Sequence, residues 1–184
     1  SVPGRHNILN SLGAISISLE MGVNVNTIKK SLKSFKGVKR RFEIRFETEN
    51  NIMIVNDYAH HPSEIRETIN TAKRSYNKNH IIAIFQPHLF TRTKTFHKEF
   101  SKELSLADKI ILTEIYPSRE QPIEGITTEM ITKNFSNEIE YYYEKNMKDI
   151  PKLLKKICKS NDIILLMGAG DIFNITNDIY KEIN

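Results

Sequence analysis

Residues of types that serve in catalysis stand directly after short apolar runs of this sequence. They are Asp57, Tyr58 and His60 after residues 52–56, and His88 and Arg92 after residues 81–85. Arginine can hold a carboxylate through two parallel hydrogen bonds, and histidine can gain or lose a proton near neutral pH. Neither a Cys/His metal cluster nor a Ser-His-Asp arrangement is suggested by the sequence. These residues therefore indicate a site that binds anionic ligands.

Two further segments follow apolar runs, and every motif has a structural alternative. Residues 116–120 (YPSRE) follow the run 109–114, and Gly168-Ala169-Gly170 follows the run 163–167. The glycine segment resembles a phosphate-binding turn, but a G-x-G without a third glycine is as often only a tight turn. Pro62 after two histidines is typical of a helix start. His88 and Arg92 could be a solvated pair, and residues 116–120 could be a polar loop, so the residues alone leave these alternatives open.

Polar residues near the beginning of the chain form a second candidate group. His6 and Asn10 are four residues apart, so they share one side of a helix if the helix begins early enough. The alternative is N-terminal capping of that helix, for which His6 and Asn7 are the candidates. Arg41, next to Arg40, could bind a phosphate group or could be surface charge.

The first 37 residues are expected to be a helical segment distinct from the rest. Apolar side chains at helical spacing lie on one helix face, and these are Ile8, Leu12, Ile15 and Leu19. Gly22 ends this first helix, and Asn24 can cap a second one that runs to Phe35. Gly37 marks a break, so we expect a boundary between residues 1–37 and 38–184.

From residue 42 onwards the pattern changes to strands alternating with helices. Residues 42–48 and 52–56 read as a β-hairpin, followed by strands at 81–85, 109–114, 139–143 and 163–167. Apolar strands that alternate with amphipathic helices predict a Rossmann-like α/β fold, a mostly parallel sheet with helices on both faces. Ligands bind beyond the carboxyl ends of the strands in such sheets, so the four polar segments should converge at one edge.

Composition narrows the class of protein. The formal net charge of +5 and pI near 9.2 come from basic residues spread along the chain, which disfavours nucleic-acid binding. A basic, non-catalytic nucleic-acid-binding α/β module stays an alternative. The single cysteine, Cys158, and the absence of a long apolar run predict a cytoplasmic protein without a membrane span or disulfides.

Six segments in order resemble the Mur ligase family of ATP-dependent amide-bond ligases, and within it the members that add L-alanine. They are GRHNILN, VKRRFE, NDYAHHPSEI, FQPHLFTRT, ADKIILTEIYPSREQPIEG and LLMGAGDI, which extend from Gly4 to about Asp171. Such ligases have a sugar domain, a central ATPase domain and a Rossmann-like C-terminal domain. This chain has no G-x-x-x-x-G-K-[ST] segment, so the resemblance implies that residues 1–37 are the end of the central domain and 38–184 the C-terminal domain.

The resemblance also implies the chemistry and the residues. ATP would activate the carboxylate of UDP-N-acetylmuramate as an acyl phosphate, which the L-alanine amine attacks, with Mg²⁺ ligands expected in a preceding portion. By motif match, His6 and Asn10 would contact adenine, Arg41 the ATP phosphates and Asp57 the ribose. Tyr58, His60, His88 and Arg92 would line the amino-acid side, and the last three are the candidate catalytic residues. A murein-tripeptide recycling ligase of the same family is the alternative. Leu89 stands where some members have a second arginine.

Overall fold

The computed structural model describes residues 3–76 and 80–184, and the chain divides into two compact units. The first is Ser1–Lys39 and the second is Arg40–Asn184. This boundary lies two residues beyond the one expected at Gly37.

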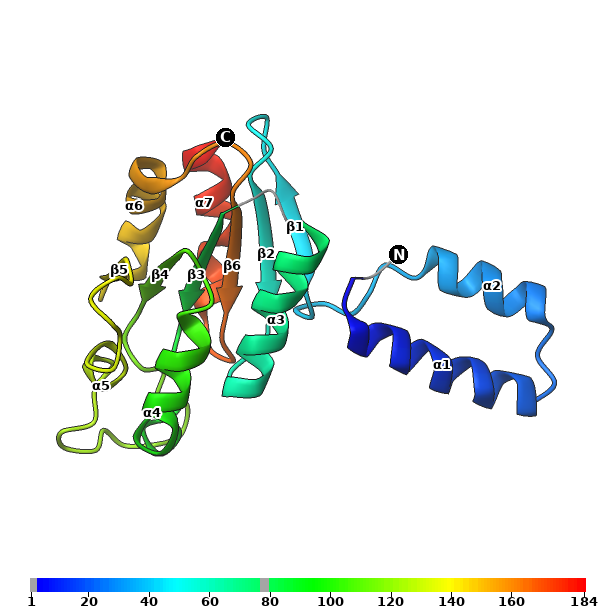
Figure 1. Cartoon of the computed structure of the whole chain (residues 1–184), viewed down its shortest axis with the longest axis horizontal. Coiled ribbons are helices and arrows are strands. Elements are labelled where there is room, and N and C mark those ends of the chain that lie inside the picture. Colours follow the sequence, from blue (N-terminus) through cyan, green and yellow to red (C-terminus); the bar gives the residue numbers. More distant parts are fainter. Residues whose placement is uncertain (1–2, 77–79) are drawn as a thin grey trace. The chain divides into compact units, whose positions relative to one another are not determined.

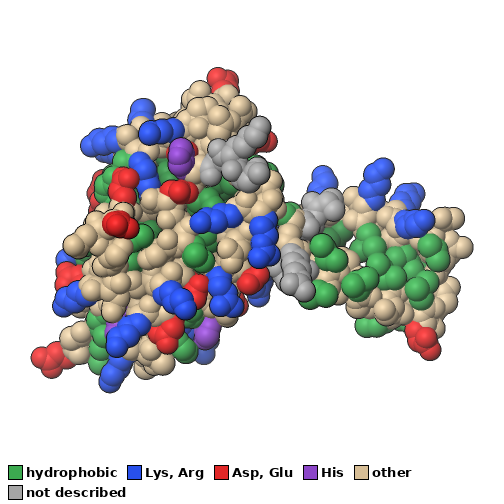
Figure 2. All heavy atoms as spheres, viewed as in Figure 1, with side chains coloured by type: hydrophobic (Ala, Val, Ile, Leu, Met, Phe, Trp, Pro, Cys, Tyr) green, Lys and Arg blue, Asp and Glu red, His purple; other side chains and the backbone are tan. Residues whose placement is uncertain are grey.

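The first unit is a pair of helices, α1 (Arg5–Glu20) and α2 (Val25–Ser34), as the sequence predicts. The side chain of Asn24 caps α2 by accepting a hydrogen bond from the Asn26 amide at 2.8 Å. The apolar side chains of the pair are largely exposed, for example Ile8 at 63% and Ile17 at 65%. Figure 2 shows hydrophobic side chains gathered on these two helices. A helix that is apolar on more than one side is normally buried in a larger protein.

The second unit is built on a six-stranded sheet in the order β1-β2-β6-β3-β4-β5. The strands are β1 (Glu43–Glu47), β2 (Met53–Asp57), β3 (Ile81–Phe85), β4 (Lys109–Leu112), β5 (Tyr141–Tyr143) and β6 (Ile163–Met167). β1 pairs antiparallel with β2 as a hairpin, and the other neighbours are parallel. The predicted hairpin and mostly parallel sheet are therefore confirmed.

Helices cover both faces of this sheet (Figure 1). One face packs against α3 (Pro62–Ser75), α4 (Phe90–Leu104) and the short α5 (Glu129–Thr132). The other packs against α6 (Ile150–Ile157), η2 (Ile172–Ile175) and α7 (Thr176–Ile183), and the turn η1 (Met147–Asp149) precedes α6. Strands β2, β3 and β6 are buried along their whole length, so each face has its own core. The core on the α6 and α7 face consists of isoleucine and leucine, whereas the core on the α3 and α4 face also contains alanine, phenylalanine, methionine and one valine.

Three strands are shorter than the sequence suggests, and β1 is shorter than the predicted run 42–48 by one residue at each end. The run 139–143 begins its strand only at Tyr141, because the Ile139 amide donates to Ser136 O in a turn at 3.1 Å. The run 109–114 ends at Leu112, since the carbonyl of Thr113 accepts from the Thr128 hydroxyl at 2.8 Å and leaves the strand ladder. Apolar periodicity does not reveal such local turns.

Two surface properties of the described residues bear on function. No helix within residues 3–76 and 80–184 is long and apolar enough to cross a membrane. On the face in Figure 2, the basic side chains of the second unit lie dispersed among other side chains rather than in one stripe.

Candidate functional site

The strand register brings four polar loops to one edge of the sheet. Asp57 pairs with Met167, which pairs in turn with Phe85, so β2, β6 and β3 end at the same level. Backbone hydrogen bonds continue the pairing beyond the strands, from the Gly168 amide to Asp57 O (3.2 Å) and from the Gln86 amide to Met167 O (3.0 Å). The expected convergence of these loops at the carboxyl ends of the strands is therefore present.

His60, His88, Arg92 and Tyr116 form a connected group at this edge. The His60 and His88 rings are 6.0 Å apart, and the ring of Tyr116 stacks on His88 at 5.7 Å. Arg92 Nη1 lies 3.1 Å from His88 Nδ1. Four residues from three segments of the chain thus line one small region. Tyr58 adjoins it, with its ring 5.1 Å from that of His60.

Hydrogen bonds assign opposite tautomers to the two histidines. A guanidinium can only donate, so Nδ1 of His88 accepts from Arg92 and the proton of the neutral ring lies on Nε2. His60 Nδ1 lies 2.8 Å from the Tyr58 carbonyl oxygen, which can only accept, so this nitrogen carries the proton. Burial, Arg92 and His60 lower the pKa of His88 below its usual value, which favours the neutral ring. In neutral form, the two rings offer an N–H donor on His88 and an acceptor on His60.

The turn that leads to His60 is also a helix start. Pro62 opens α3, and the carboxylate of Glu64 accepts from the amides of His60 (3.0 Å) and His61 (3.1 Å). The pKa of Glu64 is lowered: burial works against this, but the amide of His60 and the nearby His60 ring outweigh it. The helix-start reading therefore holds for Pro62, and it leaves the His60 ring directed towards His88.

Asp57 is buried at the end of β2. Its side chain is only 8% exposed, and its two oxygens accept the amides of Phe42 (3.0 Å) and Ala59 (2.9 Å). Burial raises its pKa, and these hydrogen bonds oppose the shift. In this structure the carboxylate fixes the backbone of two neighbouring segments.

Arg40, two residues before Phe42, contacts both the segment that follows β2 and the glycine turn that follows β6. Its guanidinium lies over the rings of Phe173 at 3.9 Å and Tyr58 at 4.7 Å, and NH2 donates to Gly170 O at 3.1 Å. Its Nε is buried and has no hydrogen-bond partner among the described residues. Arg40 has a backbone φ of 59°, in the left-handed region that most residues avoid. The neighbouring Arg41 is exposed instead.

The Gly-Ala-Gly turn is packed tightly against the chain's own side chains. A Cβ on Gly170 would lie 2.3 Å from Gln86 Oε1 and 2.6 Å from Tyr116 Cγ. Gln86 bridges this turn, donating to Asp171 Oδ1 (2.7 Å) and accepting from the Ile172 amide (3.1 Å). This packing accounts for the glycine at position 170 and favours the tight-turn interpretation.

The remaining site predictions stay predictions. Asn10 is exposed on α1, whereas the side chain of His6 lies outside the described residues. The helix begins with Gly4 at its N-cap position, so neither His6 nor Asn7 is the capping residue considered from the sequence. Within the described ranges, no group of three or more His, Cys, Asp or Glu residues could hold a metal ion.

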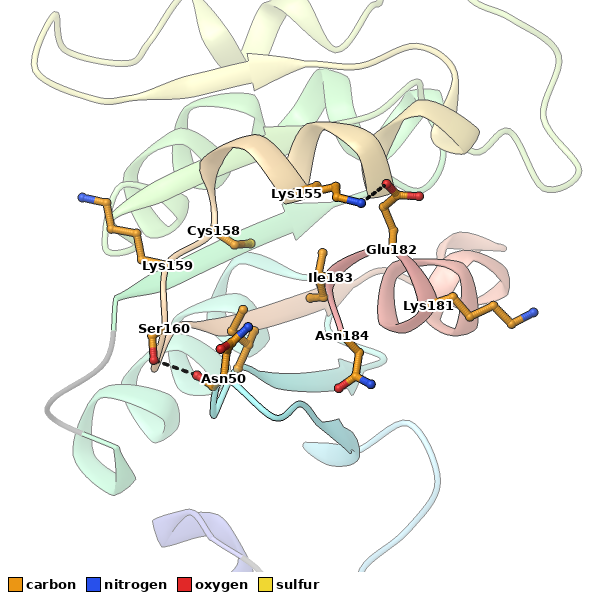
Figure 3. A pocket seen from close by; sticks show the side chains of 10 residues that line it. Asn50, Lys155, Cys158, Lys159, Ser160, Lys181, Glu182, Ile183 and Asn184 are labelled. Carbon is orange, nitrogen blue, oxygen red and sulfur yellow. Dashed lines mark hydrogen bonds and ion pairs between the residues drawn. The ribbon is translucent and has the colours of Figure 1, made fainter.

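A pocket lies at the opposite end of the sheet. It is lined by Asn50, Ile52, Lys155, Cys158, Lys159, Ser160, Lys181, Glu182, Ile183 and Asn184 (Figure 3). Lys159 and Lys181 point away from it, and Lys155 is paired with Glu182 at 3.0 Å. None of the residues chosen from the sequence lines this pocket, so it is separate from the candidate site.

Sequence reasoning missed three residues that organise the site. In the sequence, Gln86 stands out only as part of the motif FQPHLFTRT, Arg41 rather than Arg40 is the predicted phosphate contact, and Glu120 has no assigned role. The position of Gln86 directly after a buried strand was a usable signal. Nothing local in the sequence shows that Arg40 reaches Phe173 or that Glu120 reaches Thr91.

Comparisons with known proteins agree with one another. A family model described as "Mur ligase, glutamate ligase domain" matches residues 40–170. UDP-N-acetylmuramate–L-alanine ligase of Sulfurihydrogenibium sp. is 38% identical over 100% of this chain, and that of Lachnoclostridium phytofermentans is 43% identical over 99%. The chain spans about two fifths of these relatives, 40% and 39% of their lengths.

Solved structures show the same similarity. UDP-N-acetylmuramate-alanine ligase from Thermotoga maritima matches with a TM-score of 0.83 and 34% identity, covering 98% of this chain and 38% of that protein. A murein peptide ligase from Psychrobacter arcticus matches with a TM-score of 0.70 and 26% identity, covering 100% of this chain and 38% of that one.

Proposed function

The chain belongs to the Mur ligase family, and from this premise we propose that it is the C-terminal domain of an ATP-dependent ligase that joins L-alanine to UDP-N-acetylmuramate in peptidoglycan synthesis. The observation that carries the proposal is the group of His60, His88 and Arg92 at the carboxyl ends of the strands. The match of relatives that carry this activity supports the same substrate.

This group suits a small zwitterion such as an amino acid. Arg92 donates to His88 through Nη1, and its other guanidinium nitrogens have no hydrogen-bond partner within the described residues. They can hold a carboxylate, with the Nε2–H of His88 as a further donor. The Nε2 of neutral His60 can accept a hydrogen bond from the amino group, and Tyr58 closes the side next to His60. The carboxylate of the amino acid would thus meet donors on Arg92 and His88, and its amino group would meet the acceptor on His60.

The reaction requires this domain to align the substrates and to neutralise their negative charge. The sugar carboxylate attacks the terminal phosphorus of ATP, which gives an acyl phosphate and ADP. The amine of L-alanine then attacks the acyl carbon, loses a proton and displaces inorganic phosphate. No covalent protein nucleophile is needed. His60, held by Tyr58 O, is positioned to orient the amine through its lone pair.

The nucleotide side is proposed from motif matches. His6 and Asn10 would contact adenine and Arg41, which is exposed, the phosphates. Asp57 would contact the ribose only through lone pairs that the amides of Phe42 and Ala59 leave free. Mg²⁺ would be held with ATP by residues of a preceding portion of the protein.

The helical pair supports the proposed domain division. We assign residues 1–37 to the end of the central ATPase domain, which would cover the exposed side chains of α1 such as Ile8 and Ile17.

We place the reaction in the cytoplasm, where a lone thiol such as Cys158 stays reduced. Burial raises the pKa of this thiol to about 12.

A murein-tripeptide ligase is the second candidate, because a solved murein peptide ligase shares the fold over 100% of the chain. The experiment supplies the full-length protein with UDP-N-acetylmuramate, ATP and either L-alanine or the tripeptide, and measures ADP release and product mass. We expect amide formation with L-alanine. Product with the tripeptide but not with L-alanine would replace the proposal by the second candidate. Absence of product with both substrates would overturn both candidates.

A further inference from the structure

Helix α4 starts without a capping side chain of its own, although it carries Arg92 in its first turn. The residue at its N-cap position is Leu89, with a φ of 73° and no side chain able to accept a hydrogen bond. The first amides of a helix need acceptors from outside the helix, usually from Ser, Thr, Asp or Asn at this position. The segment that presents His88 and Arg92 therefore depends on another part of the chain.

Glu120 supplies the missing acceptor from the loop between β4 and α5. Its Oε2 accepts from the Thr91 amide at 3.1 Å, and its Oε1 accepts from the Thr91 hydroxyl. The pKa of Glu120 is lowered, first by the Thr91 hydroxyl and further by nearby amides and by Arg92. A carboxylate at this end of a helix also interacts favourably with the helix dipole.

The loop that carries Glu120 is itself joined to the His88 segment. The Tyr116 amide donates to Pro87 O at 2.8 Å, and the Leu89 amide donates to Tyr116 O at 2.9 Å. The Tyr116 ring stacks on His88 with an interplanar angle of 18°. The polar loop at residues 116–120 is thus an extension of the site and not only a connection.

We propose that Glu120 is a positioning residue, which fixes the first turn of α4 so that Arg92 and His88 present their donors to the carboxylate of the amino acid. This inference rests on the proposed function, because it assigns the carboxylate to L-alanine. Glu120 acts through Thr91 and need not touch the substrate.

The kinetic test compares Glu120→Ala and Glu120→Gln with Glu124→Ala in the full-length enzyme. Glu124 is an exposed glutamate of the same loop, which makes it a matched control. We expect Glu120→Ala to raise the KM for L-alanine about tenfold, because a tenfold change corresponds to the free energy that loss of a helix cap typically costs. The KM for ATP should stay unchanged. Glu120→Gln keeps one acceptor, so it should be intermediate.

A pH profile separates positioning from a purely structural cap. His88 is faced by Arg92 on α4, by His60 on the turn before α3, and by Glu120 and Tyr116 on the loop after β4. Of these, Glu120 carries the negative charge that raises the His88 pKa against the lowering by burial, Arg92 and His60. Glu120→Gln should therefore shift the acid limb of kcat/KM for L-alanine to lower pH, and an unchanged limb would contradict the role.

Hydrogen exchange distinguishes failure of this inference from failure of the proposed function. In the 184-residue chain, peptides covering residues 88–95 should exchange faster in Glu120→Ala and at the original rate in Glu124→Ala. Unchanged exchange in Glu120→Ala overturns the cap. If the wild-type enzyme uses L-alanine and Glu120→Ala leaves its KM unchanged, positioning is wrong and the function stands. If it does not use L-alanine but exchange accelerates, the function is wrong and the cap stands.

Discussion

The two ends of the sheet are made from the same strands and differ in how their side chains are used. At the carboxyl end, Gln86, Arg40 and Glu120 each connect loops that are far apart in the sequence. At the amino end, the pocket is bordered by lysines, one of them in the exposed Lys155–Glu182 pair. We therefore base the proposed site on cross-loop contacts that hold titratable groups in fixed geometry, and not on the hollow at the amino end.

The largest effect expected from this comparison is loss of amino-acid binding in Arg92→Ala. A hydrogen-bonded charge of this kind contributes about 1.5 to 3 kcal/mol, so kcat/KM for L-alanine should fall roughly 10- to 140-fold. The KM for ATP should change little, whereas Asn10→Ala should mainly weaken ATP use. Lys94→Ala, an exposed cation two residues away on α4, is the control. Equal losses for both substrates in Arg92→Ala would contradict the division of the site.

Gly170→Ala tests whether the carboxyl end is tightly packed. The added Cβ would meet Gln86 and Tyr116 at 2.3 and 2.6 Å, so one of these side chains must move. Overpacking of this kind costs about 1 to 3 kcal/mol, which corresponds to a fall of about 2 to 12 °C in Tm. Gly13→Ala is the control, because nothing lies within 4 Å of its added Cβ. Equal melting temperatures for Gly170→Ala and the wild type would refute the packing argument.

The buried carboxylate of Asp57 gives the carboxyl end a characteristic pH dependence. Burial raises its pKa above 3.8, so the folded protein holds this proton more tightly than the unfolded chain does. The stabilising contribution is complete below pH 3.8 and is lost as the pH rises through the folded pKa.

Asp57→Asn lacks this titration, so its unfolding free energy relative to wild type should increase as the pH rises from about 3.8 towards 7. Chemical denaturation at a series of pH values measures the difference. Asp178→Asn, at an exposed position on α7, is the control. A difference between Asp57→Asn and wild type that stays constant with pH would mean that Asp57 titrates normally.

Much of the fold was predictable because it depends on local patterns. The strands at 81–85 and 163–167 have the predicted limits, since a continuous apolar run marks a strand buried on both faces. Strand order and the φ of 73° at Leu89 depend on distant partners that a single sequence does not show.

The site was predictable to the same degree and for the same reason. The grouping of His60, His88 and Arg92 could be predicted because each follows a strand that is recognised locally, and their roles stay predictions. Glu120 and Gln86 act through residues 29 and 86 positions away, so their roles emerge only from the folded chain.

The smallest effect is expected at the amino end, in the ion pair between Lys155 and Glu182. Its Nζ to Oε1 distance is 3.0 Å, but the lysine side chain is 63% exposed, and such pairs contribute only about 0 to 1 kcal/mol. Lys155→Ala and Glu182→Gln, alone and together, should therefore show a small coupling in the unfolding free energy and unchanged kinetics with L-alanine. Glu120 is also a surface carboxylate, yet its removal should impair catalysis because its partner Thr91 lies in the first turn of the helix that carries Arg92. If the Lys155 variants impaired L-alanine use as much as Glu120→Ala did, position at the carboxyl end would not be what makes a surface contact functional.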